Sequence, residues 1–374
     1  MRTPHLKATA ALAVAAVLVV SLAVAAAASA AATSFLDPLR STTTVSSAVP
    51  AGGPAQGDIN PYGVVVVPRT VGALVRGDVL VSNFNDAKNE QGTGKSIVEI
   101  SPSGTQRVFA VVPRPTSAPA VGLTTALAVL RSGFVVVGSL PAPGGHSARA
   151  TAGALTILNS RGHAVMTVRG GDINGPWDMT AVDSGSHATL FVTNVLNGTV
   201  AARGRVVPRG TVVRITLALG GGAPRVTSNR VITTGFGEHT DPNALVVGPT
   251  GLGLGHGGVL YVADSVGNRI AAIPGALTRT TVLGGGGTTV ASGGALNDPL
   301  GLAIAPNGDI VSANGGDGRL QETTPGGHVA AVKTLIANGG GDLFGLALAP
   351  GGSGLYYVDD AGSGPATNSL ALLH

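Results

Sequence analysis

The sequence contains no cysteine, few aromatic residues and few charged ones. Of its 374 residues, aromatic side chains make up 3% and Asp, Glu, Lys and Arg together 11%. Without cysteine no disulfide can form, so stability must come from a hydrophobic core, and a small disulfide-stapled scaffold is excluded. Sparse aromatics and singly placed Arg residues exclude the basic, base-stacking surface of a nucleic-acid-binding protein, so we expect no nucleic-acid partner.

The first 30 residues have the pattern of a secretory signal peptide. Arg2, His5 and Lys7 precede an apolar run over 8–28, and small residues at 28–30 fit a cleavage site. We therefore expect a protein that is secreted or in the cell envelope and holds no membrane contact after cleavage. A retained transmembrane anchor is the alternative, because the run is long enough to span a bilayer.

A short pattern then recurs six times, in the order turn, apolar run, Gly, second apolar run, Asn or Asp. The copies begin near 60, 123, 175, 241, 298 and 342, and the clearest covers 298–314. Their turn anchors are Asn60-Pro61, Leu123-Thr124, Gly175-Pro176, Asp241-Pro242, Asp298-Pro299 and Asp342-Leu343. Apolar runs of four or five residues bounded by Gly, Pro, Asn or Asp indicate strands rather than helices.

Two weaker runs follow in most copies, which makes four antiparallel strands per repeat. Such a unit cannot bury its own apolar face, so the copies must stack on one another. The sequence therefore predicts an all-β fold, a six-bladed β-propeller of four-stranded antiparallel blades, over 60–374. The segment 31–59 is expected to give the last blade its outer strand, a disordered tail being the alternative. The Gly-rich tracts, including 248–258, are expected to be loops.

Two stretches resemble the NHL repeat, Tyr261–Ile270 and Asp298–Ala303, and the resemblance extends over about 60–374. It implies a binding scaffold, as most NHL-like propellers are. Related six-bladed rings include gluconolactonase-like and strictosidine-synthase-like enzymes, but a shared fold does not carry shared chemistry.

The gluconolactonase-like resemblance implies a divalent metal at the channel mouth, with Asn and Asp ligands just before the anchor Gly. The matching positions here are Tyr62, Thr125, Trp177, Asn243, Leu300 and Phe344. Only Asn243 suits a hard cation, which needs several oxygen ligands together. Asn243 and Asp264 are therefore the candidate ligands for a possible Ca²⁺.

Polar residues end the second strand of each copy, on the same rim as the anchors. They are Asn83, Ser139, Asn194, Asp264, Asn314 and Asp359. Their oxygens either bind a cation or polar ligand near the channel or make local backbone hydrogen bonds.

Two further groups are candidates for a site on that rim. Tyr62, Trp177 and Phe344 occupy equivalent positions and either line an apolar pocket or pack between blades. Glu238, His239 and Asp241 stand just before the fourth inner strand, where they either supply acid–base groups or form an exposed polar loop.

From these observations we predict a monomeric, non-catalytic scaffold that binds a protein partner or small ligand at the channel rim. The alternative is a lactonase-, esterase- or lyase-like enzyme that uses Glu238, His239, Asn243 and Asp264 as metal or acid–base residues. A structural cell-envelope protein without a small ligand is the third possibility.

Overall fold

A computed structural model describes residues 1, 33–114, 120–220, 222–361 and 367–374. The chain divides into two units, Met1–Ala32 and Thr33–His374, and every strand lies in the second. The expected signal peptide, apart from Met1, lies outside the described residues. Within the described ranges, no helix is long and apolar enough to cross a membrane.

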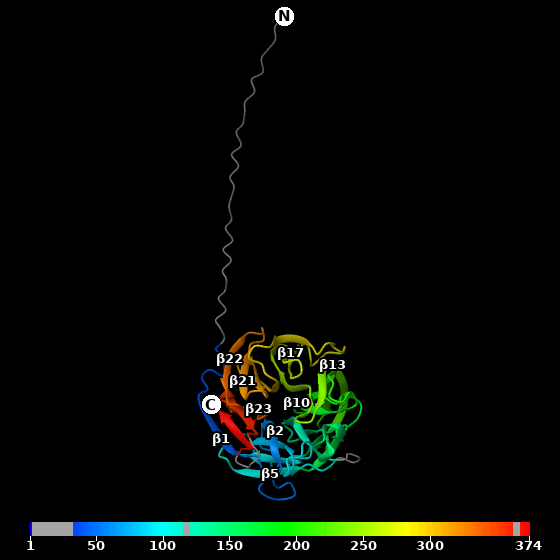
Figure 1. The fold of residues 1–374 in the computed structure, drawn as a ribbon, viewed down its shortest axis with the longest axis vertical. Helices are drawn as coiled ribbons and strands as arrows, with labels where there is room; N and C mark the ends of the chain where they lie inside the picture. The colour runs from blue at the N-terminus through cyan, green and yellow to red at the C-terminus, as the bar shows by residue number, and fades with distance from the viewer. Residues whose placement is uncertain (2–32, 115–119, 221, 362–366) are drawn as a thin grey trace. The chain divides into compact units, whose positions relative to one another are not determined.

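The strands form six antiparallel sheets, which we call blades 1 to 6 (Figure 1). Blades 1 and 2 are β2 (Ile59–Val66), β3 (Val79–Asn85), β4 (Ser96–Ile100) and β5 (Gln106–Val111), then β6 (Leu123–Val129), β7 (Val135–Ser139), β8 (Ala154–Leu158) and β9 (Ala164–Val168). Blades 3 and 4 are β10 (Pro176–Asp183), β11 (His187–Asn194), β12 (Val207–Ala218) and β13 (Arg225–Asp241), then β15 (Pro249–Leu254), β16 (Leu260–Asp264), β17 (Arg269–Ile273) and β18 (Thr288–Ser292). Blades 5 and 6 are β19 (Pro299–Ile304), β20 (Ile310–Asn314), β21 (Arg319–Thr323) and β22 (Val329–Thr334), then β23 (Leu343–Leu348), β24 (Leu355–Asp359), β25 (Ser369–Leu373) and β1 (Thr42–Ser47).

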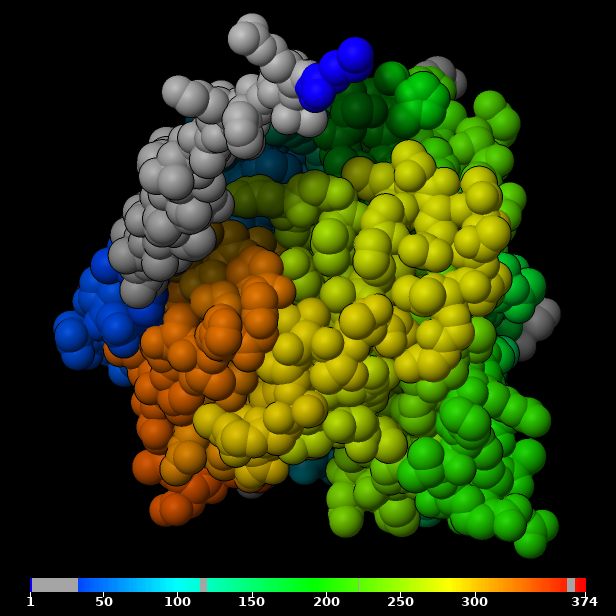
Figure 2. Space-filling view, turned by 90° about the horizontal axis from the view of Figure 1, so that it is seen from above, coloured from blue at the N-terminus to red at the C-terminus, as the bar shows by residue number. Residues whose placement is uncertain are grey.

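The blades close into a ring, and the predicted six-bladed β-propeller is confirmed. The inner strands β2, β6, β10, β15, β19 and β23 contact one another in this order, and β23 contacts β2 again. The hydrophobic core lies between adjacent sheets, so middle strands such as β4, β7 and β20 are buried on both faces, whereas the outer strands are largely exposed. Figure 2 shows blade 4, in yellow, lying between green blade 3 and orange blade 5. Helix is confined to the single turn α1 (Thr199–Ala202) and short 3₁₀ turns in the described ranges.

The N-terminal segment completes blade 6. Strand β1 pairs antiparallel with β25, with Thr42 opposite Leu373 and Ser47 opposite Ser369. Ahead of it, Leu36 is fully buried. The buried Glu322 carboxylate of β21 accepts hydrogen bonds from Ser34 Oγ (2.6 Å), Phe35 N (2.8 Å) and Leu36 N (2.9 Å). The ring is therefore closed by strands from both ends of the described unit.

The fourth copy differs from the sequence prediction. Its expected inner run at Leu245–Val247 is instead β14 (Leu245–Val247), which folds back on β13 as a hairpin around Asp241-Pro242. The inner strand of blade 4 is β15, which begins near 249 rather than 241 and lies in the tract expected to be a loop. Glycine is required there, because a Cβ on Gly251 would lie 2.3 Å from the Leu300 carbonyl oxygen.

Candidate functional site at the mouth of the central channel

A cavity of about 280 Å³ lies where the inner strands begin. Each inner strand contributes one equivalent residue to its wall. These residues are Tyr62, Thr125, Trp177, Thr250, Leu300 and Phe344. The six-fold repeat therefore converges on this point, at the mouth of the channel that the inner strands enclose.

The fourth position of this ring is Thr250, not Asn243 as the sequence predicted. Thr250 follows Pro249 at the start of β15, as Leu300 follows Pro299 at the start of β19. Asn243 reaches the same cavity from the loop between β13 and β14. Five of the six predicted positions are correct, and the sixth was misplaced because Asp241-Pro242 has the sequence of an anchor.

Aromatic rings form one wall of the cavity. Tyr62 stacks on Phe84 with ring centroids 4.5 Å apart and lies 4.2 Å from Phe344. Trp177 meets Tyr62 edge-on at 6.2 Å. Tyr62, Trp177 and Phe344 both line the cavity and pack in one hydrophobic cluster. The sequence left two alternatives for these residues, lining a pocket or packing between blades, and they do both.

Two segments far apart in the sequence meet at the mouth. Gln91, in the loop between β3 and β4, donates from Nε2 to the carbonyl oxygen of Asn243 (2.5 Å). Val246 of β14 is buried in the cluster that holds Tyr62 and Trp177. The β13–β14 hairpin thus borders the cavity on one side and is anchored by apolar packing.

Asp178 lies at the junction between this cavity and a second one. The second cavity, about 430 Å³, continues along the inner strands and has mostly aliphatic walls; Asp178 and Thr125 border both. Asp178 Oδ1 accepts one hydrogen bond, from Met179 N (2.7 Å). Burial raises the pKa of Asp178 well above its usual range, and this hydrogen bond only partly opposes the shift.

Asp178 breaks the repeat. At the equivalent position the other inner strands carry Gly63, Ala126, Gly251, Gly301 and Gly345. Small residues at this position let neighbouring inner strands approach one another closely. A carboxylate there departs from this pattern of small residues. Such a local exception is typical of a functional residue, and the sequence analysis missed it.

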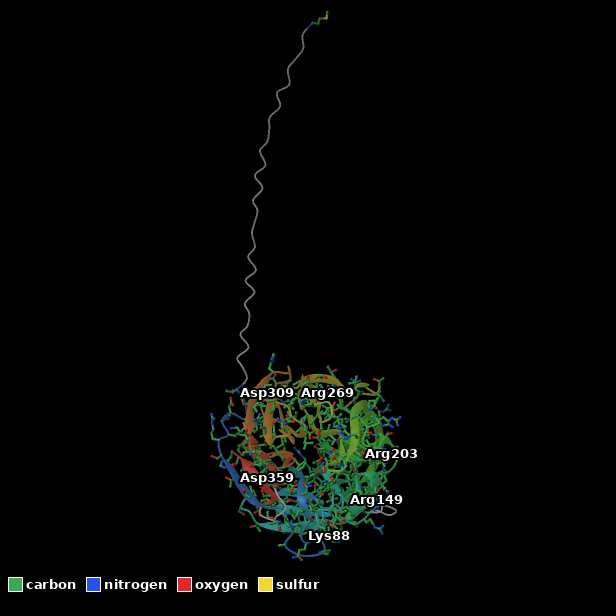
Figure 3. All side chains as sticks on the ribbon, viewed as in Figure 1. Lys88, Arg149, Arg203, Arg269, Asp309 and Asp359 are labelled. Carbon is green, nitrogen blue, oxygen red and sulfur yellow. The ribbon has the colours of Figure 1, made fainter. Side chains whose placement is uncertain are left out.

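Two further carboxyl groups reach the cavity from the rim. Burial raises the pKa of Asp360 to about 8, with the charges of Asp342 and Asp359 adding to the shift. Burial also raises the pKa of Asp298, although Ser265 and His239 oppose this. The described residues that line the cavity include no Lys, Arg or His. In Figure 3 the labelled Lys88, Arg149, Arg203 and Arg269 lie around the outside of the ring.

Replacing Asp360 by asparagine should change how stability depends on pH. The folded state holds the Asp360 proton up to about pH 8, whereas the unfolded state releases it near the ordinary value of 3.8. The free energy of unfolding therefore falls as pH rises through this window. The groups that face Asp360 are Asp342, Asp359 and Tyr62. We expect Asp360→Asn to gain about 1 to 3 kcal/mol at pH 8 and little at pH 4.

Urea unfolding of both proteins at pH 4, 6 and 8 measures this effect. Equal losses of stability with rising pH in wild type and Asp360→Asn would show that Asp360 ionises normally.

The six polar residues at the ends of the second strands lie at the cavity end of the blades but are not in its wall. Each makes a hydrogen bond within the protein, and those of Asn194, Asp264 and Asp359 are to residues nearby in the sequence. Asn83 donates to Ala48 O, Asn194 and Asn314 donate to Val192 O and Ala295 O, Ser139 donates to Ala154 O, Asp264 accepts from Arg269 Nε and Asp359 accepts from Ala361 N. In blades 1, 5 and 6 the wall includes instead residues one or two positions further along the chain, Asn85, Gly315 and Asp360.

Glu238, His239 and Asp241 are divided between two faces of β13. Glu238 is fully buried and accepts a hydrogen bond from Asn197 N (2.8 Å); burial raises its pKa to about 7. His239 and Asp241 are half-buried on the opposite face, near Asp298. None of the three lines the cavity, so the expected acid–base group is not assembled there.

The wall does not fit the metal site that the gluconolactonase-like resemblance implies. The six equivalent positions hold three aromatics, one leucine and two threonines, and none is a carboxylate. The two Thr hydroxyls are bonded to backbone carbonyls. Across the described ranges, no three His, Asp or Glu side chains gather around one point. Asp264, a candidate ligand, is paired with Arg269 at 2.7 Å.

No protein-family profile matches the chain, and no curated protein matches it in sequence. Its structure is similar to a gluconolactonase from Xanthomonas campestris, with 14% identity, 92% of this chain and 91% of that chain covered, and a TM-score of 0.55. It is similar to a PQQ-bound aldose sugar dehydrogenase from Streptomyces coelicolor, with 17% identity, coverages of 89% and 97%, and a TM-score of 0.55. It is also similar to a calcium-binding regucalcin from Agrobacterium tumefaciens, with 14% identity, coverages of 85% and 91%, and a TM-score of 0.53.

At such identities the likeness shows the fold alone. The distant similarity to gluconolactonase-like propellers is confirmed at that level. The finer resemblance to the NHL repeat stays a prediction.

Proposed function

We propose that this chain is an exported, monomeric, non-catalytic binding protein that holds a small polar ligand in the cavity at the channel mouth. The observation that carries the proposal is the composition of the cavity wall. Aromatic side chains, three carboxyl groups and side-chain amides line one concave space, and buried amide oxygens of Asn60 and Asn85 have no hydrogen-bond partner there. Polar groups placed beside aromatic and aliphatic side chains in one concavity suit the binding of a small polar ligand.

A screen for ligand-induced stabilisation tests the proposal. The mature protein is melted with a library of amines, sugars, organic acids and nucleosides, because a ligand that binds only the folded state raises the melting temperature. We expect at least one hit, and we expect Gln91→Ala at the mouth to reduce its stabilisation. A library in which no compound of any class shifts the transition would contradict the proposal.

A lactonase-, esterase- or lyase-like enzyme is the second candidate, and the raised pKa values of Asp178 and Asp360 favour it. Carboxyl groups that stay protonated near neutral pH in a cavity can act as general acids. The candidate residues shift accordingly from Glu238 and His239 to Asp178 and Asp360. Turnover of lactone or ester substrates that is lost in Asp178→Asn, with the fold intact, would favour this enzyme over a binding protein.

A further inference from the structure

We propose that the ligand of the channel-mouth cavity is a small organic ammonium ion. The inference rests on the proposed binding function and names the class of ligand. Three features of the described wall point to it: unpartnered amide oxygens, carboxyl groups with no basic residue beside them in the wall, and aromatic side chains.

Three buried amide oxygens of the wall are acceptors without a partner. Asn60 Oδ1, Asn85 Oδ1 and Gln91 Oε1 are buried and have no hydrogen-bond partner. Asn60 and Asn85 are only 7% and 3% exposed, so bulk water does not reach them freely. A buried acceptor without a partner is unfavourable, and a ligand that donates N–H groups would satisfy it.

Several donors of the same wall are already used inside the protein. Thr125 Oγ1 donates to Trp177 O, Thr250 Oγ1 to Leu300 O (3.0 Å), Asn85 Nδ2 to Asn89 Oδ1 (2.6 Å) and Gln91 Nε2 to Asn243 O (2.5 Å). The amides of Asn85 and Gln91 are thus held with the nitrogen bonded and the oxygen free, whereas Asn89 uses its oxygen as the acceptor for Asn85. The two free oxygens favour a ligand that donates hydrogen bonds.

The described wall contains acidic groups and no basic one. Asp178, Asp298 and Asp360 reach the cavity, and the described lining contains no basic residue. Two other buried carboxylates are paired with a base, Asp264 with Arg269 at 2.7 Å and Glu99 with Arg107, whereas Glu238 and Glu322 are held by hydrogen bonds alone. The raised pKa values of Asp178 and Asp360 agree with a missing positive charge, which a cationic ligand would supply.

The aromatic wall distinguishes an organic cation from a bare metal ion. Tyr62, Trp177 and Phe344 line the cavity, and an ammonium group is attracted to aromatic rings when water is excluded. A metal ion would instead need several oxygen ligands at close range, and no three His, Asp or Glu side chains of the described ranges gather around one point. At about 280 Å³ the cavity is at the lower end of small-molecule sites, which sets the size of the cation.

The chain has a built-in probe for the experiment, because Trp177 is its single tryptophan and lines the cavity. Its fluorescence is titrated with isobutylamine and benzylamine and with their neutral counterparts, isobutanol and benzyl alcohol. D-Glucose and CaCl₂ are titrated in parallel. We expect at least one cation to bind about tenfold or more tightly than its neutral counterpart.

Matched variants separate charge from shape. Asp178→Asn and Asp360→Asn should each weaken the cation about tenfold and leave neutral compounds unchanged. Asp37→Asn removes an exposed carboxylate outside the cavity wall and should change nothing. Circular dichroism verifies the fold of each variant, and either cavity variant suffices if the other does not fold.

The outcomes distinguish the two proposals. Equal affinity for a cation and its neutral counterpart, or binding of glucose or Ca²⁺ alone, would overturn the ammonium inference and leave small-ligand binding intact. A lack of binding by these cations, with hits of another class in the stabilisation screen, would do the same. A cavity that takes no compound in either experiment would overturn both.

Discussion

Replacing Gly301 by alanine should destabilise the propeller by roughly 3 kcal/mol or more. A Cβ at this position would lie 2.1 Å from the carbonyl oxygen of Phe344, in the neighbouring inner strand. The same contact recurs around the ring, since a Cβ on Gly345 would lie 2.3 Å from Tyr62 O. The neighbour is backbone rather than a flexible side chain, so only separation of the two blades could relieve the clash. Chemical unfolding monitored by circular dichroism measures the loss.

Gly284→Ala is the matched control. No atom lies within 4 Å of its added Cβ, its φ lies outside the left-handed region, and the residue is exposed. We expect a change within about 0.5 kcal/mol, as for other surface substitutions. If Gly301→Ala were as mild as Gly284→Ala, the inner strands could not be packed as closely as described.

Removing residues 33–47 should have the second large effect, a loss of about 5 kcal/mol or more. The deletion exposes β25 as an edge strand and removes the fully buried Leu36. It also takes three hydrogen-bond donors from the buried Glu322 carboxylate. This loss is comparable to the whole stability of a typical domain. We therefore expect the truncated chain to be insoluble or to melt far below the chain that begins at residue 33.

Thr44→Ala serves as its control, because it alters an exposed side chain of β1 and leaves the backbone pairing intact. It should melt with the parent chain. A truncated protein that melted cooperatively at the parent temperature would show that β1 does not close the ring.

The repeat pattern was sufficient to predict the fold, because strand punctuation is local. A proline followed two positions later by glycine, as at Pro299 and Gly301, marks the start of an inner strand in the clearest copies. The number of copies gives the number of blades. The prediction was wrong in blade 4, where Asp241-Pro242 has the sequence of an anchor but forms the turn of the β13–β14 hairpin. The true strand β15 is rich in glycine for steric reasons, and this composition concealed it.

The site was predictable only in part. The equivalence of Tyr62, Trp177 and Phe344 could be read from the repeat, and so could Asp178 if departures from the glycine rule had been examined. The bond between Gln91 and Asn243 could not, because it joins loops of different blades. Burial decides which amide oxygens stay unpartnered, and burial of a loop residue follows from the whole ring rather than from its local sequence.

The most direct test of this account is a crystal structure of the mature protein with the compound that binds most tightly in the Trp177 titration. We predict that the compound lies in the cavity at the channel mouth, against Trp177 and within hydrogen-bond distance of at least one of Asp178 and Asp360. A compound found on the outer surface of the blades, with only water in the cavity, would contradict the central claim that this cavity is the binding site.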